Sequence, residues 1–317
     1  MTDTRGYFGL VPEGTFLYGC LRTADGVIFE PTRRIPASPT DRGMSGLIVQ
    51  STLNDDNVLH IDGSASAAAA TSRGCSVTVE GDDELAIWAS AAGVEGKPWR
   101  VTMSQDAVTW SETDAMELTG RLLPPGLQWH VPAPDKGILY VSQLYEVSGT
   151  ADGRAVRGFI GLDRTWMAEG GMLYVKKDVL VGEQLHNTWY TWATKYTDGT
   201  YDAGHFMLAN DRGGFALLTN ERQEILRTTA VTGEVFPGED RNFPKDITLE
   251  INGEKWEFLP DPHGIMPDFL SAAKKLPTPQ NEGRWRRVGD TREPDIWFAW
   301  GEIAPGHGTT PTQRWRS

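Results

Sequence analysis

The sequence has few cysteines and no long apolar run. Two cysteines occur in 317 residues, Cys20 and Cys75, and they form neither a C-x-x-C pair nor a zinc-ligand spacing. No apolar stretch approaches the ~18 residues that a membrane-spanning helix needs. The first residues, M-T-D-T-R-G, contain no secretory hydrophobic region. We therefore expect a cytoplasmic protein with reduced thiols and no stable membrane insertion, with a Cys20–Cys75 disulfide as the less favoured alternative.

Positive charge is also scarce. Lysine and arginine number 30 against 43 aspartates and glutamates, which gives a formal net charge of −13. Nucleic acids and anionic membrane surfaces bind clustered positive charge, so neither is expected as a partner. The charge is typical of a soluble protein that repels its neighbours, and it predicts no oligomeric state.

Motifs for nucleotide cofactors and for serine hydrolases are missing. There is no G-x-G-x-x-G after a strand and no G-x-x-x-x-G-K-[ST]. The nearest approach to a nucleophile elbow is G-M-S-G-L, in which Leu47 replaces the second glycine. No two histidines have ligand spacing; they are His60, His130, His186, His205, His263 and His307. We expect no cofactor and no metal, with a cupin-like metal site from distant strands as an alternative.

What the sequence does contain is a short pattern that occurs twice, 173 positions apart. Residues 15–28 read T-F-L-Y-G-C-L-R-T-A-D-G-V-I, and residues 188–201 read T-W-Y-T-W-A-T-K-Y-T-D-G-T-Y. Both are β-rich runs that end in Asp-Gly, a strong hairpin-turn signal. A second repeated pattern, at another offset, aligns residues 95–101 with 252–258 and Trp99 with Trp256. Repeats on this scale indicate two related halves rather than a solenoid.

Strand and turn signals alternate along the chain, which indicates an all-β protein of barrels or sandwiches. Short helices are expected only at residues 64–72 and Pro267–Lys275. We place two domains at residues 1–168 and 169–317. The expected strands cover residues 15–22, 27–31, 45–51, 57–62, 76–80, 84–89, 99–103, 138–148, 155–162, 172–176, 188–196, 201–208, 214–219, 225–231, 247–251, 255–259 and 295–302.

The twelve tryptophans favour a pocket with flat apolar walls, although core packing accounts for most of them. Alternate residues of a strand share a face, so Tyr190, Trp192 and Thr194 form a candidate pocket wall. Tyr190 is either a proton donor or an ordinary core tyrosine. His186 opens this strand and His205 lies on its hairpin partner, so these two histidines are the ones we expect nearest a ligand.

Residues 154–166 read R-A-V-R-G-F-I-G-L-D-R-T-W. With the strand before it (140–149) and the aromatic hairpin after it, this stretch resembles the tandem-lipocalin family, which includes carotenoid hydratases, AttH-like proteins and several pericyclic-reaction enzymes. The family marker is a glycine-containing strand ending in D-H-x-W, matched here by Asp163-Arg164-Thr165-Trp166. The likeness covers about residues 125–260 and implies two lipocalin-like β-barrel domains packed side by side.

The marker also implies a site. In the hydratase branch, its histidine and a nearby aspartate are implicated in protonating an isolated alkene, which needs a strong acid in an apolar pocket. Arg164 takes the place of that histidine and cannot donate the proton. Asp163 is then the candidate acid, with Trp166 and Arg164 as substrate-binding neighbours. The alternative is a structural Asp163 that accepts backbone hydrogen bonds beside Arg164.

These features predict a cofactor-independent enzyme that acts on a lipophilic small molecule, terpenoid, steroid or polyketide-like. The reaction would be hydration, isomerisation or cyclisation in an apolar barrel pocket. Asp163 or Tyr190 would move a proton, while Trp166 and Trp192 line the pocket and hold the substrate. The alternative is a carrier that binds the same kind of molecule without chemistry, in which Asp163→Asn would leave affinity unchanged.

Overall fold

The structure is a computed structural model. It describes residues 5–41, 43–80, 85–173, 175–179, 188–208, 214–237, 244–268, 280–303 and 313–315. Tertiary contacts divide the chain into two units. The first comprises Met1–Leu53 and Ile61–Lys177, and the second comprises Asn54–His60 and Asp178–Ser317.

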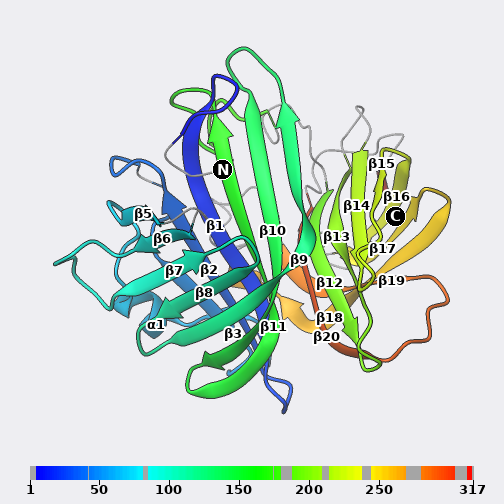
Figure 1. Cartoon of the computed structure of the whole chain (residues 1–317). Helices are drawn as coiled ribbons and strands as arrows, with labels where there is room; N and C mark the ends of the chain where they lie inside the picture. The colour runs from blue at the N-terminus through cyan, green and yellow to red at the C-terminus, as the bar shows by residue number, and fades with distance from the viewer. Residues whose placement is uncertain are drawn as a thin grey trace. The chain divides into compact units, whose positions relative to one another are not determined.

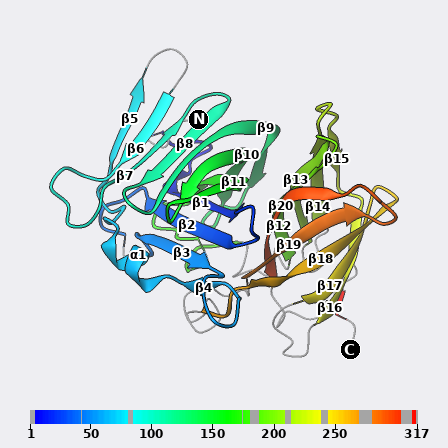
Figure 2. The ribbon, with the colours of Figure 1, turned by 90° about the horizontal axis from the view of Figure 1, so that it is seen from below.

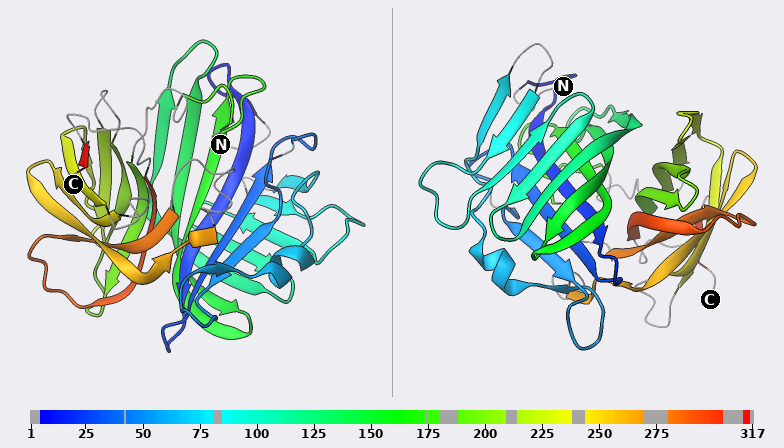
Figure 3. Two further views of the ribbon diagram at one scale, coloured as in Figure 1. Left: turned by 180° about the vertical axis from the view of Figure 1, so that it is seen from behind. Right: turned by 60° about the horizontal axis from the view of Figure 1, so that its bottom comes forward.

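The first unit is built on one strongly curled sheet of antiparallel neighbours (Figure 1; Figure 3, right). Its described strands lie in the order β4-β3-β2-β1-β11-β10-β9-β8-β7-β6-β5. They are β1 (Val11–Arg22), β2 (Ile28–Pro36), β3 (Leu47–Ser51), β4 (His60–Ile61), β5 (Ser76–Glu80), β6 (Leu85–Ala89), β7 (Trp99–Met103), β8 (Ala107–Glu112), β9 (Met116–Val131), β10 (Ile138–Ala151) and β11 (Arg154–Met167).

A short helix, α1 (Gly63–Ala68), lies next to β3 and is shorter than the predicted 64–72 (Figure 2). It begins where the Asp62 carboxylate accepts the backbone N–H groups of Ser64 and Ala65, which is an N-cap. The Asp62-Gly63 dipeptide, which as a sequence signal predicts a turn, therefore starts a helix.

The curl gives the first sheet an inner and an outer face. We call the face that carries the apolar cluster the inner face; the cluster includes Leu17, Trp110, Tyr145, Ile160 and Leu162. Successive residues of a strand alternate between the faces, so the odd-numbered neighbours of Ile160 and Leu162 on β11 point outward.

The second unit has its own curled sheet, in the described order β15-β14-β13-β12-β20-β19-β18-β17-β16-β21. Its inner face carries an aromatic cluster that includes Tyr190, Trp192, Phe206, Phe258 and Trp285. The strands are β12 (Thr188–Tyr196), β13 (Tyr201–Leu208), β14 (Gly214–Asn220), β15 (Leu226–Thr228), β16 (Val231–Pro237), β17 (Pro244–Ile251), β18 (Glu254–Ile265), β19 (Gln280–Arg287), β20 (Pro294–Ile303) and β21 (Gln313–Trp315).

The strands of the two sheets pair in the same pattern, which confirms the prediction of two lipocalin-like halves. In each, the first strand pairs with the second and also with a late strand, β11 or β20. The repeated turn is the same in both: Gly26 N–H donates to the Thr23 carbonyl, and Gly199 N–H to the Tyr196 carbonyl. Both glycines have φ near +88°, at 88° and 87°, which glycine adopts without strain.

The alignment of Trp99 with Trp256 does not correspond to equivalent positions in the two sheets. Trp99 lies on β7, the ninth strand in the order of its sheet, whereas Trp256 lies on β18, the seventh of its own. Both tryptophans are buried in the core of their unit, so the likeness reflects a common demand for a large apolar side chain.

Most predicted strands are confirmed, and three predictions are corrected. Residues 172–176 form only an isolated bridge. The strands β8, β9, β19 and β21 were not predicted, and 225–231 divides into β15 and β16. The predicted helix Pro267–Lys275 lies mostly outside the described residues. No helix in the described part of the chain is both long enough and apolar enough to cross a bilayer.

Candidate functional site

Asp163 is the centre of a buried polar group on the outer face of the first sheet. Its side chain is 1 % exposed, and its Oδ2 accepts hydrogen bonds from Tyr18 Oη at 2.7 Å and Tyr140 Oη at 2.5 Å. Two phenols thus donate to one carboxylate oxygen, which is a compact arrangement for holding or moving a proton.

Three neighbouring strands bring this group together. β1 pairs with β11 and β10 pairs with β11, so Phe16 and Ser142 flank Asp163 in the register. Tyr18 is the register partner of Gly161, and a Cβ on that glycine would lie 2.6 Å from the Tyr18 ring. Glycine is required there because the Tyr18 ring lies directly against the backbone of β11 on its way to Asp163.

Further aromatic residues lie on the same face of the sheet. Phe16 lies opposite Asp163 and is partly exposed, while Phe159 lies four residues along β11 and is buried. Together with Tyr18 and Tyr140 they place flat apolar surface beside the acid. Such surface suits a lipophilic molecule better than a charged one.

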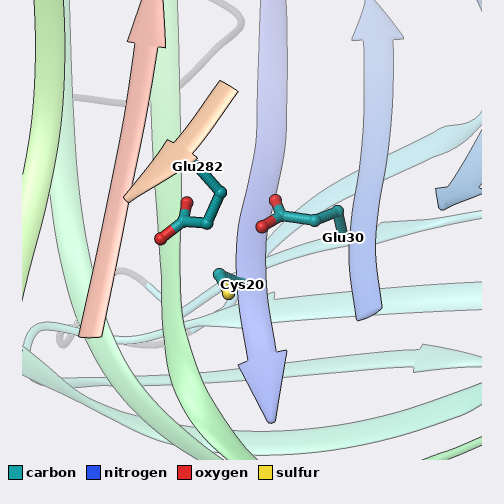
Figure 4. Close-up of side chains that lie close together, drawn as sticks. All are labelled: Cys20, Glu30 and Glu282. Atoms are coloured by element: carbon teal, nitrogen blue, oxygen red, sulfur yellow. The ribbon is translucent and has the colours of Figure 1, made fainter. Parts of the chain in front are cut away.

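A second polar row continues across the outer face. Cys20 on β1 and Glu30 on β2 lie close together and have no exposed surface (Figure 4). Gln50 on β3 also has no exposed surface and is the register partner of Glu30. Cys20 Sγ and a carboxylate oxygen of Glu30 lie within 4.8 Å of each other. Neither polar atom of the Gln50 amide has a hydrogen-bond partner among the described residues.

The row does not make a complete metal site within the first unit. A thiolate and a carboxylate are both zinc ligands, but zinc takes at least three protein ligands. This unit contributes two such side chains to the row, Cys20 and Glu30. The row is better described as buried polar lining that extends from Asp163 across β1, β2 and β3.

Arg164 and Trp166 lie on the opposite face of β11 from Asp163, so the structure does not bring the three together. Arg164 Nη2 donates to Gln143 Oε1 at 3.1 Å, and its guanidinium lies 6.0 Å from the Trp166 ring centroid. Trp166 is fully buried, and its Nε1 donates to the Arg5 carbonyl at 2.8 Å. Both side chains therefore connect β11 to neighbouring segments of the first unit.

Tyr190 and Trp192 share the inner face of the second sheet, in the alternation expected for residues 188–196. Tyr190 is fully buried. Burial raises the pKa of its phenol well above the usual value, and the negative charge of Glu282 adds to the rise. Glu282 itself accepts the Ala299 backbone N–H at 2.8 Å. Tyr190 accordingly keeps its proton and can donate a hydrogen bond, but it is a poor acid.

His205 lies on the other face of the second sheet from Tyr190. Its register partner is Thr191, and its ring lies 6.3 Å from that of Trp189. Burial lowers its pKa to about 3, so the imidazole is neutral at physiological pH. His186 lies outside the described residues.

Sequence reasoning missed Tyr18, Tyr140, Glu30 and Gln50. Tyr18 is inside the repeated pattern and Tyr140 lies in the predicted strand 138–148, but neither has a local signal that connects it to Asp163. Glu30 lies in a strand whose nine residues are all buried in the structure, which its local sequence does not show. Only the strand register connects these residues.

No family model and no curated protein matches the sequence. Among solved structures, a Nitrosomonas europaea protein provisionally assigned as an AttH is 16% identical, with a TM-score of 0.54 and 96% of each chain covered. CghA with Sch210972 is 13% identical, with a TM-score of 0.47 over 93% of this chain and 89% of that chain. Kievitone hydratase from Nectria haematococca is 9% identical, with a TM-score of 0.44 over 95% and 91%. The first comparison carries weight for the fold alone: this chain has the two-sheet, lipocalin-like fold of the AttH type.

Proposed function

We propose that the chain is a cofactor-independent enzyme that acts on a lipophilic small molecule, with Asp163 as its proton carrier. The observation that carries the proposal is the buried Asp163 carboxyl. Its Oδ2 accepts hydrogen bonds from the Tyr18 and Tyr140 hydroxyls at 2.7 and 2.5 Å. A buried acid beside flat apolar surface is what proton transfer to a carbon skeleton requires. The resemblance of the marker motif points in the same direction.

The reaction is a hydration, isomerisation or cyclisation of a terpenoid, steroid or polyketide-like molecule. In a hydration, the proton of the Asp163 carboxyl adds to one alkene carbon and water adds to the resulting cation. A proton of that water then returns to the carboxylate, so the acid is regenerated and the atoms balance. Tyr18 and Tyr140 stabilise the carboxylate in between, because both phenols donate to it.

The other predicted residues receive supporting roles. Arg164 and Trp166 position Asp163 from the inner face of β11. Tyr190 holds its proton too firmly for acid catalysis at neutral pH. His205 does not accept one there, because its pKa is about 3. The proposal therefore assigns proton transfer to Asp163 alone.

The test is small-molecule mass spectrometry after incubation of the protein with a lipophilic extract of its host. We expect wild type to convert a metabolite, by one added water or at constant mass with a shifted retention time. Asp163→Asn should lower that turnover about 10²–10⁴-fold, the usual contribution of a general acid. Glu117→Gln, an exposed carboxyl on β9, is the matched control and should convert at the wild-type rate.

A carrier is the second candidate function. The hydrogen bonds from Tyr18 and Tyr140 favour it too, because a buried carboxylate that accepts two hydrogen bonds can have a purely structural role. In that case wild type and Asp163→Asn would both enrich one compound unaltered. Turnover by Asp163→Asn at the wild-type rate would overturn the catalytic assignment.

A further inference from the structure

Three loops leave the same end of the first sheet. The register places Val11, Met167, Ile138 and Val131 in one row across β1, β11, β10 and β9. β1 and β10 begin at this row, whereas β11 and β9 end there, at the end that is uppermost in Figure 1. All three loops belong to the first unit. We call them the rim loops, and their described residues are 5–10, 132–137, 168–173 and 175–177.

Contacts between the rim loops hold them together. Ala168 N–H donates to the Gly137 carbonyl at 3.2 Å, and a Cβ on Gly137 would lie 3.2 Å from Leu10 Cδ2. The Arg5 carbonyl, at the start of the first loop, accepts the Trp166 indole N–H of β11. The exposed side chains of the three loops therefore lie on one connected end of the unit.

The first rim loop turns sharply at Phe8. Tyr7 and Leu10 exchange backbone hydrogen bonds at 3.1 and 2.8 Å, and between them Phe8 and Gly9 have φ of 54° and 77°. Positive φ at both central residues is typical of a type I′ turn, whose first central position favours asparagine or glycine. A bulky side chain there strains the backbone, and the Phe8 side chain is 66 % exposed. Neither turn formation nor core packing accounts for a phenylalanine at this position.

Further apolar side chains are exposed at the same end. Phe8 and Val175 are the two most exposed large apolar side chains in the described part of the chain, at 66 % and 65 %. Val175 lies in a short turn of the third loop, where its N–H donates to the Met172 carbonyl at 3.0 Å. Val11, at the start of β1, is 41 % exposed. Exposed apolar side chains gathered at one end of a domain indicate an interaction surface.

The charge of the rim loops is opposite to that of the whole chain. Basic side chains outnumber acidic ones in their described residues, although the formal net charge of the chain is −13. Lys176 and Lys177 directly follow Val175, and all three are exposed. The net charge of the chain, which argues against an anionic surface as a partner, therefore does not describe this end. The charged residues are Arg5, Lys136, Lys176 and Lys177 on one side and Asp135 and Glu169 on the other.

A surface that is both apolar and basic fits an anionic bilayer. Lysines and arginines are attracted to anionic headgroups, and exposed apolar side chains gain free energy when they enter the interface. A nucleic acid would use the basic side chains but would leave Val175 in water. The combination of the two kinds of side chain therefore favours a lipid surface.

We propose that the rim loops dock the first unit on the surface of an anionic bilayer. Phe8 and Val175 enter the headgroup region, and Lys176 and Lys177 contact the lipid phosphates. The contact is peripheral and needs no segment that crosses the bilayer. It does not depend on the proposed catalytic function, because none of these side chains belongs to the Asp163 group.

Co-sedimentation of the full chain with lipid vesicles tests the proposal. One set of vesicles contains phosphatidylcholine alone, and the other contains equal amounts of phosphatidylcholine and phosphatidylglycerol. We expect wild type to bind the anionic vesicles more tightly than the neutral ones. Added salt should weaken binding to the anionic vesicles, because it screens the attraction between the lysines and the headgroups.

Phe8→Asn tests the apolar part of the contact. It should weaken binding to the anionic vesicles about tenfold or more, since a phenylalanine ring that leaves water contributes at least this much. Stability in urea should not fall, because asparagine suits the first position of this turn. Ile225→Asn is the matched control: Ile225 is 58 % exposed in the second unit, so the change should leave vesicle binding unaltered.

Lys176→Glu tests the electrostatic part. The change removes one positive charge and adds one negative charge, and each unit of charge near an anionic leaflet is worth about a factor of five. Binding to the anionic vesicles should therefore fall about 5- to 30-fold. Arg100→Glu makes the same change of charge at an exposed position on β7, away from the rim loops, and should bind nearly like wild type.

Asp163→Asn separates this proposal from the proposed enzyme, because it should bind vesicles like wild type whether or not it converts a metabolite. Three results would each overturn the assignment: no binding of wild type to anionic vesicles, equal binding by Phe8→Asn and Ile225→Asn, or equal binding by Lys176→Glu and Arg100→Glu. Retention of wild type by a DNA duplex but not by vesicles would assign the rim loops to nucleic acid instead.

Discussion

At the scale of single residues, Gly161 decides whether Tyr18 can reach Asp163. Replacing it with alanine would place a Cβ 2.6 Å from Tyr18 Cζ and 2.9 Å from the hydroxyl oxygen. We expect Gly161→Ala to cost about 1–3 kcal/mol of stability, because the ring or the strand must move. It should also lower turnover, because Tyr18 leaves the carboxylate. Urea unfolding and the metabolite assay measure the two effects.

Gly63→Ala is the control for that change. Nothing lies within 4 Å of a Cβ at Gly63, at the start of α1, so unfolding and turnover should both remain near wild type. If Gly161→Ala were as stable and as active as Gly63→Ala, Tyr18 would have no part in the proposed proton transfer.

Only part of this residue-level arrangement is readable from the sequence. The marker motif predicts Asp163 as a candidate acid, and alternation places Tyr190 with Trp192. Tyr18 lies 145 positions from Asp163, and their contact depends on the β1–β11 register. Register follows from how a whole sheet pairs, which no local pattern encodes.

At the scale of secondary-structure elements, one buried ion pair joins β2 to β8 across the inner face of the first sheet. Arg33 contacts Glu112 with two hydrogen bonds, at 2.5 and 2.6 Å, and Trp110 Nε1 donates to the same carboxylate at 2.8 Å. The Arg33 side chain has no exposed surface and lies over the Trp99 ring at 4.7 Å. Such a pair fixes the two strands only while both partners are present.

Glu112→Gln should therefore destabilise the protein by about 3–5 kcal/mol, since it leaves the Arg33 charge buried without its counter-charge. Urea unfolding monitored by tryptophan fluorescence measures the loss. Asp114→Asn, which removes the exposed pair between Asp114 and Lys97, should change stability by no more than about 1 kcal/mol. Equal effects of the two changes would mean that Arg33 is stabilised by its other partners.

Elements with turn chemistry of their own were the easiest to predict. Asp152-Gly153 and Asn252-Gly253 both adopt positive φ at both positions, as a tight hairpin turn requires. In contrast, β9 carries Gly120, Pro124, Pro125 and Gly126, which are loop signals in a sequence. Its strand structure comes from pairing with β8 and β10, so tertiary context overrides local preference.

At the scale of the whole molecule, the chain is one plan used twice with different interiors. Both halves share the pairing pattern of their first strand and the repeated Asp-Gly turn. The sequence predicts the shared turn. The first interior contains the Arg33–Glu112 pair, and the second contains the aromatic cluster of Tyr190, Trp192 and Trp285. These contents could not be predicted, because an interior is assembled from strands that are distant in sequence. The two halves thus share their strand pairing and differ in the side chains that fill their interiors.

The acid side of the stability curve is expected to depend on His205. Its pKa is about 3 in the folded chain against 6.5 for an ordinary histidine, and burial is the cause. Because the unfolded state binds this proton more readily, stability is lost as pH falls below about 6.5. From pH 7.5 to 5.0 the loss due to this group is about 2 kcal/mol.

Urea unfolding of wild type and His205→Gln at both pH values isolates that contribution. Glutamine does not titrate, so the variant should lose about 2 kcal/mol less than wild type between pH 7.5 and 5.0. All other carboxyls and histidines are common to both proteins and cancel in the difference. An identical pH dependence would show that the pKa of His205 is the same in the folded and unfolded chains, so the outer face of β13 would have to accommodate a charged imidazole at pH 5.0.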